Sequence, residues 1–147
     1  MANVESEVNR YKRNKQIFTF CLLDIDYFKK INDQYGHQVG DNVLVQLSTL
    51  IKKTLREYDH FGRIGGEEFG ILLPGTRSIE AKDIINRLQT QILTTAFNNQ
   101  NNPIYITLSI GLVESWPNCT YKLLFSRADL ALYQAKDDGR NQVVVLD

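Results

Sequence analysis

The sequence predicts one α/β domain, in which helices flank a mixed β-sheet with a central hairpin. Three observations support this fold class. The 147 residues are 43% hydrophobic and include seven Tyr, seven Phe and one Trp, enough to bury one sizeable core. Strand-like apolar runs alternate with segments of helical periodicity. Between two apolar runs, Gly65-Gly66 predicts a tight hairpin turn, because glycine adopts positive φ at little steric cost.

The first half of the chain predicts five elements in order. They are a helix over 4–15, a strand over 17–23, a short helix from 27 to 36, a longer helix after 41 and the hairpin over 58–74. The strand is apolar nearly throughout, which is typical of a central strand covered on both faces. Gly36 is well placed to end the short helix, and Asp41 to cap the start of the longer one.

The second half predicts a helix from 78, a polar loop over 98–103, a strand over 104–113, a further helix after 118 and a strand over 142–146. Ser78 is the expected N-cap of the first of these helices. The strand over 104–113 carries on one face Ile104, Ile106, Leu108 and Ile110. The last helix has an inward stripe of small and apolar residues, namely Leu124, Ala128, Ala131 and Ala135.

Charge and composition exclude several classes of protein. Lys and Arg total 17, as do Asp and Glu, so no global field favours nucleic acid or a membrane. No apolar run approaches the roughly 20 residues that cross a bilayer, and the polar N-terminal segment lacks a signal-peptide core. Cys21 and Cys119 lie far apart, and Cys21 is expected to be a buried thiol. We expect a cytoplasmic domain without nucleic-acid or membrane contact, which leaves open a membrane anchor in a parent protein.

Three carboxylates are the first candidates for chemistry. Glu67 and Glu68 follow the hairpin glycines directly, and Asp24 stands where the first strand is expected to run into a loop. Adjacent carboxylates repel, and hard divalent cations bind clustered carboxylate oxygens. Strand ends in α/β folds commonly carry ligands, so these acids would suffice for one or two Mg²⁺ ions. The alternatives are a solvated turn with incidental acids and a capping role for Asp24.

Four ordered motifs carry a resemblance to a known family. They are DIDYFKKINDQYGHQVGD over 24–41, GGEEF over 65–69, TLSIG over 107–111, and ADLALYQAK with GRN over 128–136 and 139–141. With these motifs, from about residue 17 to its end, the chain resembles the GGDEF family of diguanylate cyclases in its GGEEF variant. The resemblance implies an α/β (α+β) fold similar to the nucleotidyl cyclase and polymerase palm. Its central mixed, mostly antiparallel β-sheet would be flanked by helices, with the hairpin in the active site.

In that family two GTP molecules condense to cyclic di-GMP and release two pyrophosphates. The resemblance implies an enzyme dependent on Mg²⁺ (or Mn²⁺), in which each domain presents one GTP to a second copy across a two-fold axis. Asp24, Glu67 and the backbone carbonyl of Ile25 would ligate the metal with help from Glu68, and Glu67 would be the base for the 3′-hydroxyl. The alternative is a non-catalytic receptor domain that binds GTP or cyclic di-GMP and signals to a partner.

The resemblance also implies how the base of GTP is bound. Asn32, His37 and Asp41 would hold the guanine base and nucleoside. An Asp accepts hydrogen bonds from both N1–H and the exocyclic amine of guanine, and adenine offers no such donor pair. The structural alternatives are a local cap for Asn32, a turn histidine for His37 and a helix cap for Asp41.

The triphosphate has its own implied contacts. Lys136 and Arg140 are four residues apart on the last helix or its end, so they share a face. Backbone N–H groups near Phe28 and Lys29, at a helix start, would add to the phosphate cradle. The alternative for the two cations is an ordinary solvated basic turn at a helix C-terminus.

A second site for the product is implied just ahead of the hairpin. Arg56 and Asp59 have the spacing of the family's RxxD inhibitory site, where the Arg would read the O6 and N7 edge of guanine and the Asp its amino edge. Arg87 falls where some family members supply a second arginine from the neighbouring helix. The alternative is a surface Arg–Asp pair, which contributes little energy.

One family motif is missing. Family domains usually open with Asp-x-Leu-Thr-Gly-Leu-x-Asn-Arg, which this sequence does not contain, since it begins at Met1, part-way along the first helix. We therefore interpret 1–147 as a single GGDEF-type domain without the start of that helix and the motif before it. Because the sequence contains no module that would bring two half-sites together, we expect a monomer with weak activity or a product-linked dimer.

Overall fold

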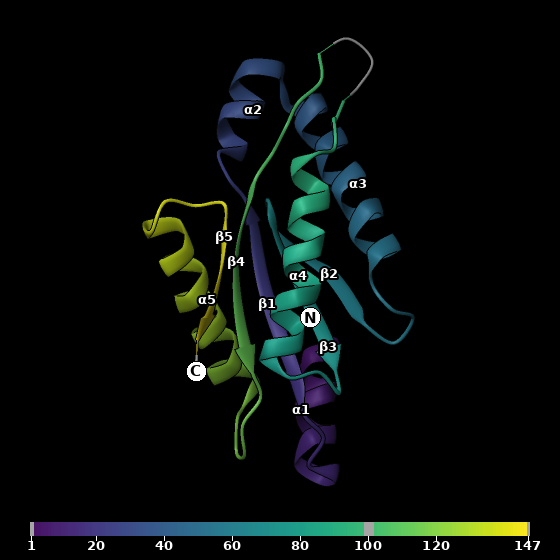
Figure 1. The fold of residues 1–147 in the computed structure, drawn as a ribbon, viewed down its shortest axis with the longest axis vertical. Coiled ribbons are helices and arrows are strands. Elements are labelled where there is room, and N and C mark those ends of the chain that lie inside the picture. Colours follow the sequence, from purple (N-terminus) through teal and green to yellow (C-terminus); the bar gives the residue numbers. More distant parts are fainter. Residues whose placement is uncertain (1, 99–101, 147) are drawn as a thin grey trace.

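The computed structural model describes residues 2–98 and 102–146, which form a sheet with helices packed on both faces (Figure 1). The elements in chain order are α1 (Ala2–Asn14), β1 (Phe18–Ile25), α2 (Phe28–Tyr35), α3 (His37–Thr54), β2 (His60–Gly65), β3 (Glu68–Pro74), α4 (Ser78–Leu93), β4 (Leu108–Glu114), α5 (Tyr121–Asp137) and β5 (Gln142–Leu146). Every helix and strand that the sequence predicts is therefore present, with some shifted boundaries.

The sheet is mixed and mostly antiparallel, which confirms the predicted fold class. Its strand order is β2-β3-β1-β4-β5. β1 lies at the centre and pairs antiparallel with β3 and β4, and β2 and β3 form the hairpin. Only β4 and β5 run parallel. All eight residues of β1 are buried, as expected of a central strand.

The alternation of side chains along β1 creates two cores. One core lies between the sheet and α2, α3 and α4, and from β1 it contains Cys21, Leu23 and Ile25. The other lies under α1 and α5, and from β1 it contains Phe18, Phe20 and Leu22. In Figure 1, α4 crosses in front of the strands and α1 lies behind them. Because side chains two residues apart lie on the same face of a strand, Asp24 lies on the α5 face with Leu22. The side chains of α5 are therefore its neighbours.

Two boundaries near the predicted site differ from expectation. β1 continues through Ile25, so Asp24 lies inside the strand and the expected loop begins after it. Gly36, at φ 94°, ends α2 as predicted, but it also directly precedes α3, which begins at His37. The prediction that Asp41 caps this helix is therefore wrong, because Asp41 lies a full turn inside it.

The start of α4 also differs from expectation. The N-cap is Arg77, which makes no side-chain cap bond, and Ser78 is the first helical residue. The N–H of Ser78 donates instead to Glu114 of β4 at 2.8 Å. A carboxylate from a strand 36 residues away thus satisfies the helix end, a role that local sequence signals do not reveal.

The predicted strand over 104–113 is shorter and begins later. β4 covers Leu108–Glu114, and Ile104 forms only an isolated bridge with Phe97. The four isoleucine and leucine side chains of the predicted face nevertheless lie together in one core. The middle of the predicted loop over 98–103 lies outside the described residues.

α5 packs unusually close to β4. A Cβ at Gly111 would lie 2.4 Å from the backbone N of Leu132 and 2.5 Å from the carbonyl oxygen of Ala128. The predicted inward stripe of α5, including Ala128, is buried. This close approach places the C-terminal end of α5 against the polar end of β1. In the described parts of the chain, the helices are too short or too polar to cross a bilayer.

Candidate functional site

Asp24 is the centre of the candidate site. Its neighbours across the sheet are Glu68 on β3 and Ser109 on β4. The side chain is only 9% exposed, and its Oδ2 accepts a hydrogen bond from the ammonium of Lys136, which α5 carries to this face. The other carboxylate oxygen, Oδ1, is buried and has no partner among the described residues. A buried oxygen without a donor is costly to keep, so this carboxylate has unused capacity to bind.

The hairpin tip brings the other two carboxylates to Asp24. The turn is made by Gly66, at φ 53°, and Glu67, and Glu68 is already the first residue of β3. Arg63 Nε holds the turn by donating to the carbonyl oxygen of Gly66 at 2.8 Å. The N–H of Ile25 donates to the carbonyl oxygen of Glu67 at 3.4 Å, which joins the tip to the end of β1. The backbones of the four residues that the sequence predicts around a metal thus lie next to one another.

The electrostatics reflect this crowding of acids. Burial raises the pKa of Asp24, Lys136 partly offsets this by its hydrogen bond and charge, and Glu67 and Asp26 raise it further. Burial also raises the pKa of Glu68, as do the charges of Asp24, Asp129 and Glu67, while Lys136 lowers it. The proton affinity of both carboxyls is therefore higher than usual, as expected where negative charges cluster around a single ammonium.

The donor set fits a hard divalent cation. In the residues that the structure describes, no three His, Cys, Asp or Glu side chains already converge as a metal cage. The ammonium of Lys136 instead takes the place of a cation at Asp24. The partnerless Oδ1 of Asp24 and the adjacent carboxyls of Glu67 and Glu68 are the oxygen ligands that Mg²⁺ prefers.

The residues expected to hold the base lie where α2 meets α3. Asn32 is on α2, and a Cβ at Gly40 would lie 1.8 Å from its Oδ1, so the amide sits directly over the first turn of α3. Asp41 follows on an exposed position and lines a pocket of about 400 Å³ with Leu44 and Arg63, among others. His37 is the exposed first residue of α3. Asn32 and Asp41 thus lie close together, and His37 is one turn of α3 before Asp41.

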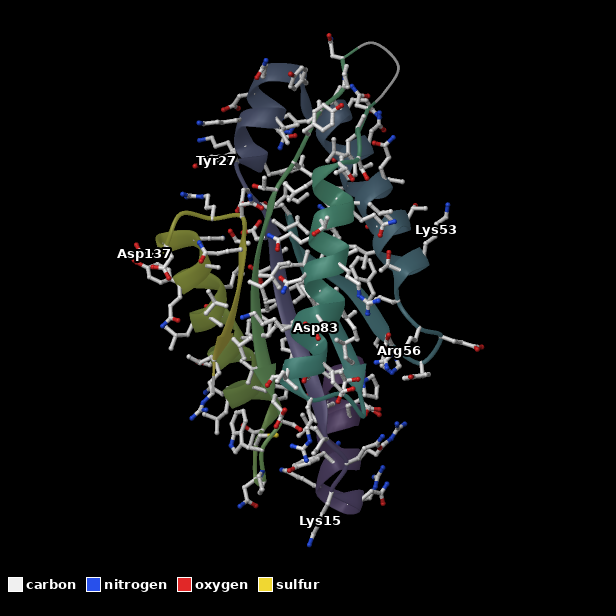
Figure 2. All side chains as sticks on the ribbon, in the orientation of Figure 1. Lys15, Tyr27, Lys53, Arg56, Asp83 and Asp137 are labelled. Carbon is white, nitrogen blue, oxygen red and sulfur yellow. The ribbon has the colours of Figure 1, made fainter. Side chains whose placement is uncertain are left out.

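The residues expected to hold phosphates come from two directions. Phe28 and Lys29 open α2, and Tyr27 before them has a left-handed backbone, at φ 57° and ψ 32°. Arg140 follows α5 and places its guanidinium 4.8 Å from the centre of the Tyr27 ring. Figure 2 shows Tyr27 at the end of the molecule that carries α2, well away from Arg56. Lys136 and Arg140 do not point to one common partner, since Lys136 bonds Asp24.

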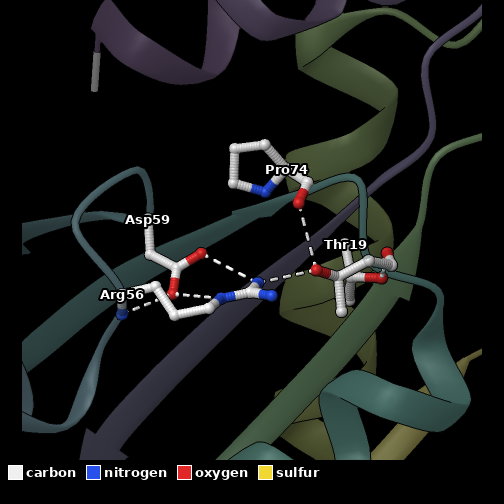
Figure 3. A network of polar contacts seen from close by, with 5 residues as sticks. Thr19, Arg56, Asp59 and Pro74 are labelled. Carbon is white, nitrogen blue, oxygen red and sulfur yellow. Dashed lines mark hydrogen bonds and ion pairs between the residues drawn. The ribbon is translucent and has the colours of Figure 1, made fainter.

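The predicted product-site residues also meet. Arg56 donates from Nε and Nη2 to the two oxygens of Asp59, both at 3.0 Å, and Nη2 also donates to Thr76 at 2.8 Å (Figure 3). The Asp59 side chain is 1% exposed, whereas that of Arg56 is 38% exposed. A cleft of about 450 Å³ is lined by Thr54, Arg56, Asp59, Ile84, Arg87 and Gln91. The cleft therefore contains both arginines.

Sequence reasoning missed three residues of these sites. Asp26 accepts hydrogen bonds from Thr107 and Ser109 and from the backbone N–H of Asn141, and it is buried. Tyr27 packs against Arg140, and Thr76 supports Arg56. The spacing of Asp26 could have indicated its role. It lies two residues after Asp24, and in an extended chain residues two apart lie on the same face. The others depend on tertiary contacts.

The fold and the site together define a mixed α/β domain whose central hairpin carries an acidic tip. The family model described as "Diguanylate cyclase, GGDEF domain" matches residues 2–142, and the chain belongs to this family. It is 39% identical over 142 residues to diguanylate cyclase DgcP of Pseudomonas aeruginosa, covering 97% of this chain and 21% of that protein. It is also 39% identical over 150 residues to the probable diguanylate cyclase DgcT of Escherichia coli, covering 97% and 32%. The chain thus spans a third or less of the length of these relatives.

Solved structures agree with this assignment. Diguanylate cyclase SiaD of P. aeruginosa, in complex with its activator SiaC, superposes with a TM-score of 0.94 at 38% identity, over 99% of this chain and 56% of that one. The GGDEF domain of DgcB from Caulobacter crescentus, in complex with c-di-GMP, gives 0.93 at 27% identity, over 98% and 86%. An active GGEEF domain of a Vibrio cholerae diguanylate cyclase gives 0.87 at 33% identity, over 99% and 93%.

Proposed function

We propose that this domain is a diguanylate cyclase that condenses two GTP molecules to cyclic di-GMP and two pyrophosphates. The observation that carries the proposal concerns the carboxylate of Asp24. One oxygen bonds the ammonium of Lys136, the other has no partner within residues 2–98 and 102–146, and the carboxyls of Glu67 and Glu68 are neighbours. Such a site suits a metal–triphosphate. The positive metal would match the acids of the hairpin, and the negative triphosphate would match the basic groups of α5.

The proposed reaction makes two identical bonds. The 3′-oxygen of one GTP attacks the α-phosphorus of the other, the bond from that phosphorus to the bridging oxygen breaks, and pyrophosphate leaves. Glu67, at the hairpin tip, takes the proton of the 3′-hydroxyl. A second, symmetric attack closes the ring, so two phosphoester bonds form, two protons are released and two pyrophosphates leave.

The carboxyls of Asp24, Glu67 and Glu68 and the carbonyl of Ile25 would hold Mg²⁺ or Mn²⁺. When bound, such an ion neutralises charge on the triphosphate and lowers the pKa of a ligated hydroxyl. Lys136 then pairs with phosphate oxygens in place of Asp24, and Arg140 adds a second positive charge from the turn after α5. The N–H groups of Phe28 and Lys29, at the start of α2, face the same phosphates.

The guanine base is bound at the junction of α2 and α3. Asp41 accepts from N1–H and the exocyclic amine, and Asn32, held against Gly40, contributes its amide. His37 contacts the nucleoside from the first position of α3. An ATP would leave Asp41 without its donor pair, so the site selects GTP.

A second copy of the chain completes the site. The acids, the base-binding residues and the basic groups of one domain surround a single nucleotide, so the attacking 3′-hydroxyl has to come from a nucleotide on another domain. A two-fold axis makes the two attacks equivalent. Catalysis therefore requires an encounter of two domains.

The cleft beside β2 is the proposed inhibitory site for cyclic di-GMP. Asp59 already occupies the Nε–Nη2 edge of Arg56, so Arg56 would meet a guanine through the rest of its exposed guanidinium. Arg87 supplies the second arginine across the cleft. Binding there would reduce activity without blocking the GTP site, since Figure 2 places Arg56 far from Tyr27.

Turnover of GTP tests the proposal. The domain is incubated with GTP and Mg²⁺, alone and fused to a dimerising helix, and products are separated by chromatography. We expect cyclic di-GMP, and we expect Glu67→Gln to lower its formation by about 10²-fold or more, the range for loss of a general base. The control is Glu80→Gln, an exposed glutamate on α4. A folded, dimerised domain that binds GTP and forms no product would instead support the receptor function.

A further inference from the structure

The turn between α5 and β5 has an unusual backbone. Gly139, Arg140 and Asn141 are consecutive, with φ of 115°, 66° and 48°. Side chains other than glycine rarely adopt this left-handed conformation, and two in succession require support from outside the turn. The N–H of Arg140 donates to the carbonyl oxygen of Ala135 at 2.9 Å, which fixes only the start of the turn to α5.

Asp26 holds the far end of this turn. Its Oδ2 accepts from the N–H of Asn141 at 3.0 Å and from Thr107 Oγ1 at 2.6 Å. Its Oδ1 accepts from Ser109 Oγ at 2.6 Å. The carboxylate is thus buried and uses both oxygens, and a charged acceptor with three donors is among the stronger hydrogen-bonding arrangements in proteins.

Gln89 holds the same residue from the other side. It lies on α4, is 8% exposed, and donates from Nε2 to the side-chain oxygen of Asn141 at 3.2 Å and to the carbonyl oxygen of Leu108 at 3.0 Å. Both hydrogens of its amide are therefore used. Asn141 is fixed by Asp26 at its backbone and by Gln89 at its side chain.

The fixed turn determines where Arg140 points. Arg140 directly precedes Asn141, and its guanidinium lies 4.8 Å from the Tyr27 ring, on the loop that leads into α2. Asp26 is the residue before Tyr27, so one side chain joins the two loops that carry the proposed phosphate contacts. If the turn relaxed to an ordinary backbone, the direction of the Arg140 side chain would change.

We infer that Asp26, supported by Gln89, is a positioning residue that orients Arg140 toward the triphosphate. Asp26 touches neither nucleotide nor metal and acts through the backbone of Asn141. The inference rests on the proposed function, because it assigns Arg140 to the phosphates of GTP.

A double-mutant cycle tests this coupling. The probe is α,β-methylene GTP with Mg²⁺, whose carbon bridge prevents turnover, and the measurement is its Kd by calorimetry. We expect Arg140→Ala and Asp26→Ala each to weaken binding about 10-fold, the order expected for one charge-assisted hydrogen bond. In the double variant we expect no more than about 2-fold beyond Arg140→Ala, because Asp26 acts through Arg140.

Two further variants separate positioning from folding. Asp26→Asn keeps an acceptor for Asn141 and Thr107 and can donate to Ser109 Oγ, so we expect binding within about 3-fold of wild type. The exposed Asp83→Ala on α4 is the matched control. Should Asp26→Ala fail to fold by circular dichroism, Gln89→Leu replaces it in the same cycle, with the same expected non-additivity.

Two outcomes would overturn the inference. Losses that multiply to about 100-fold in the double variant would show that Asp26 and Arg140 act independently. Unchanged binding in the Asp26→Ala variant would remove the positioning role while the proposed function stood. A wild-type domain that does not bind the analogue at all would instead overturn the proposed function itself.

Discussion

The carboxylate of Asp24 shows why the candidate site is costly for the ligand-free domain. Its burial and its acidic neighbours raise its pKa, and only Lys136 compensates. Glu68 shares the same surroundings and has its pKa raised for the same reasons. Charged carboxylates arranged in this way destabilise the free fold at neutral pH, and a bound cation would stabilise them.

The raised pKa values of Asp24 and Glu68 predict that the stability of the domain depends on pH. The unfolded chain has ordinary pKa values, about 3.9 for Asp and 4.3 for Glu. At a pH between these values and the raised pKa values of the folded state, the folded state binds more protons than the unfolded chain. The free energy of unfolding therefore falls as pH rises through this range. Removing one of these acids should therefore stabilise the domain increasingly as pH rises toward neutrality.

Urea unfolding of Glu68→Gln from pH 3.5 to pH 7 measures this effect. We expect the variant and wild type to have similar stability at the acid end, and the variant to become the more stable of the two through the raised pKa of Glu68. Asp83→Asn, on an exposed position beyond the first turn of α4, should follow wild type throughout. A constant difference between Glu68→Gln and wild type across the range would contradict a raised pKa of Glu68 in the folded state.

Much of the candidate site could be predicted from the sequence, residue by residue, because its motifs keep acids, glycines and basic residues at fixed spacing. What could not be predicted is the pairing between them. Lys136 and Asp24 are 112 residues apart, and their contact depends on the face of β1 that α5 covers. The role of Asp26 likewise depends on Ser109 and Asn141, which arrive from distant parts of the chain.

At the level of elements, the packing of α5 on β4 positions the basic side of the site. Gly111 permits this packing, because its missing Cβ leaves room for the backbone of α5. Lys136, near the end of the same helix, then reaches Asp24 at the end of β1. The site therefore depends on how closely one helix approaches one strand.

Gly111→Ala tests this dependence. The added Cβ would meet backbone atoms at 2.4 and 2.5 Å, which cannot move aside as a side chain could. We expect a loss of about 1–3 kcal/mol in the free energy of unfolding, the usual cost of overpacking, measured by chemical denaturation. Ser126→Ala, exposed on α5, is the control, and wild-type stability in Gly111→Ala would contradict the proposed packing.

The elements themselves were largely predictable, and their ends were not. Apolar periodicity indicated each helix and strand, since it follows directly from which face is buried. The start of α3 was misplaced because Gly36 both ends one helix and precedes the next. The start of α4 was misread because Glu114, on a different strand, bonds the N–H that a local cap would otherwise satisfy.

At the scale of the whole molecule, two candidate sites share one sheet and lie apart. The acidic hairpin tip belongs to the first, and the cleft of Arg56 and Arg87 lies beside the opposite end of the same hairpin. The family model matches residues 2–142, which is nearly the whole chain. The named cyclases are longer proteins, and this chain spans a third or less of their length.

Arg87→Ala is the sharper test of product binding in the cleft. Arg56→Ala would remove the guanidinium that pairs with the buried carboxylate of Asp59 and leave it only the backbone N–H of residue 56, so a loss of folding could be mistaken for a loss of binding. Arg87 is exposed and makes no ion pair with a described residue, so its loss should leave stability unchanged. We expect the affinity for cyclic di-GMP, measured by calorimetry, to fall about 10-fold or more. Equal affinity in Arg87→Ala and in the exposed control Lys82→Ala would remove Arg87 from the site.

In the proposed reaction two domains, each carrying one GTP, make the product together. The most direct measurement is the initial rate of cyclic di-GMP formation per chain, with GTP and Mg²⁺ in excess, across a range of chain concentrations. We expect this rate to rise with concentration and fusion to a dimerising helix to remove the rise. We also expect two pyrophosphates per cyclic di-GMP. A rate per chain that is independent of concentration in a monomeric domain, or the absence of cyclic di-GMP from a folded, dimerised domain that binds GTP, would contradict the proposed reaction.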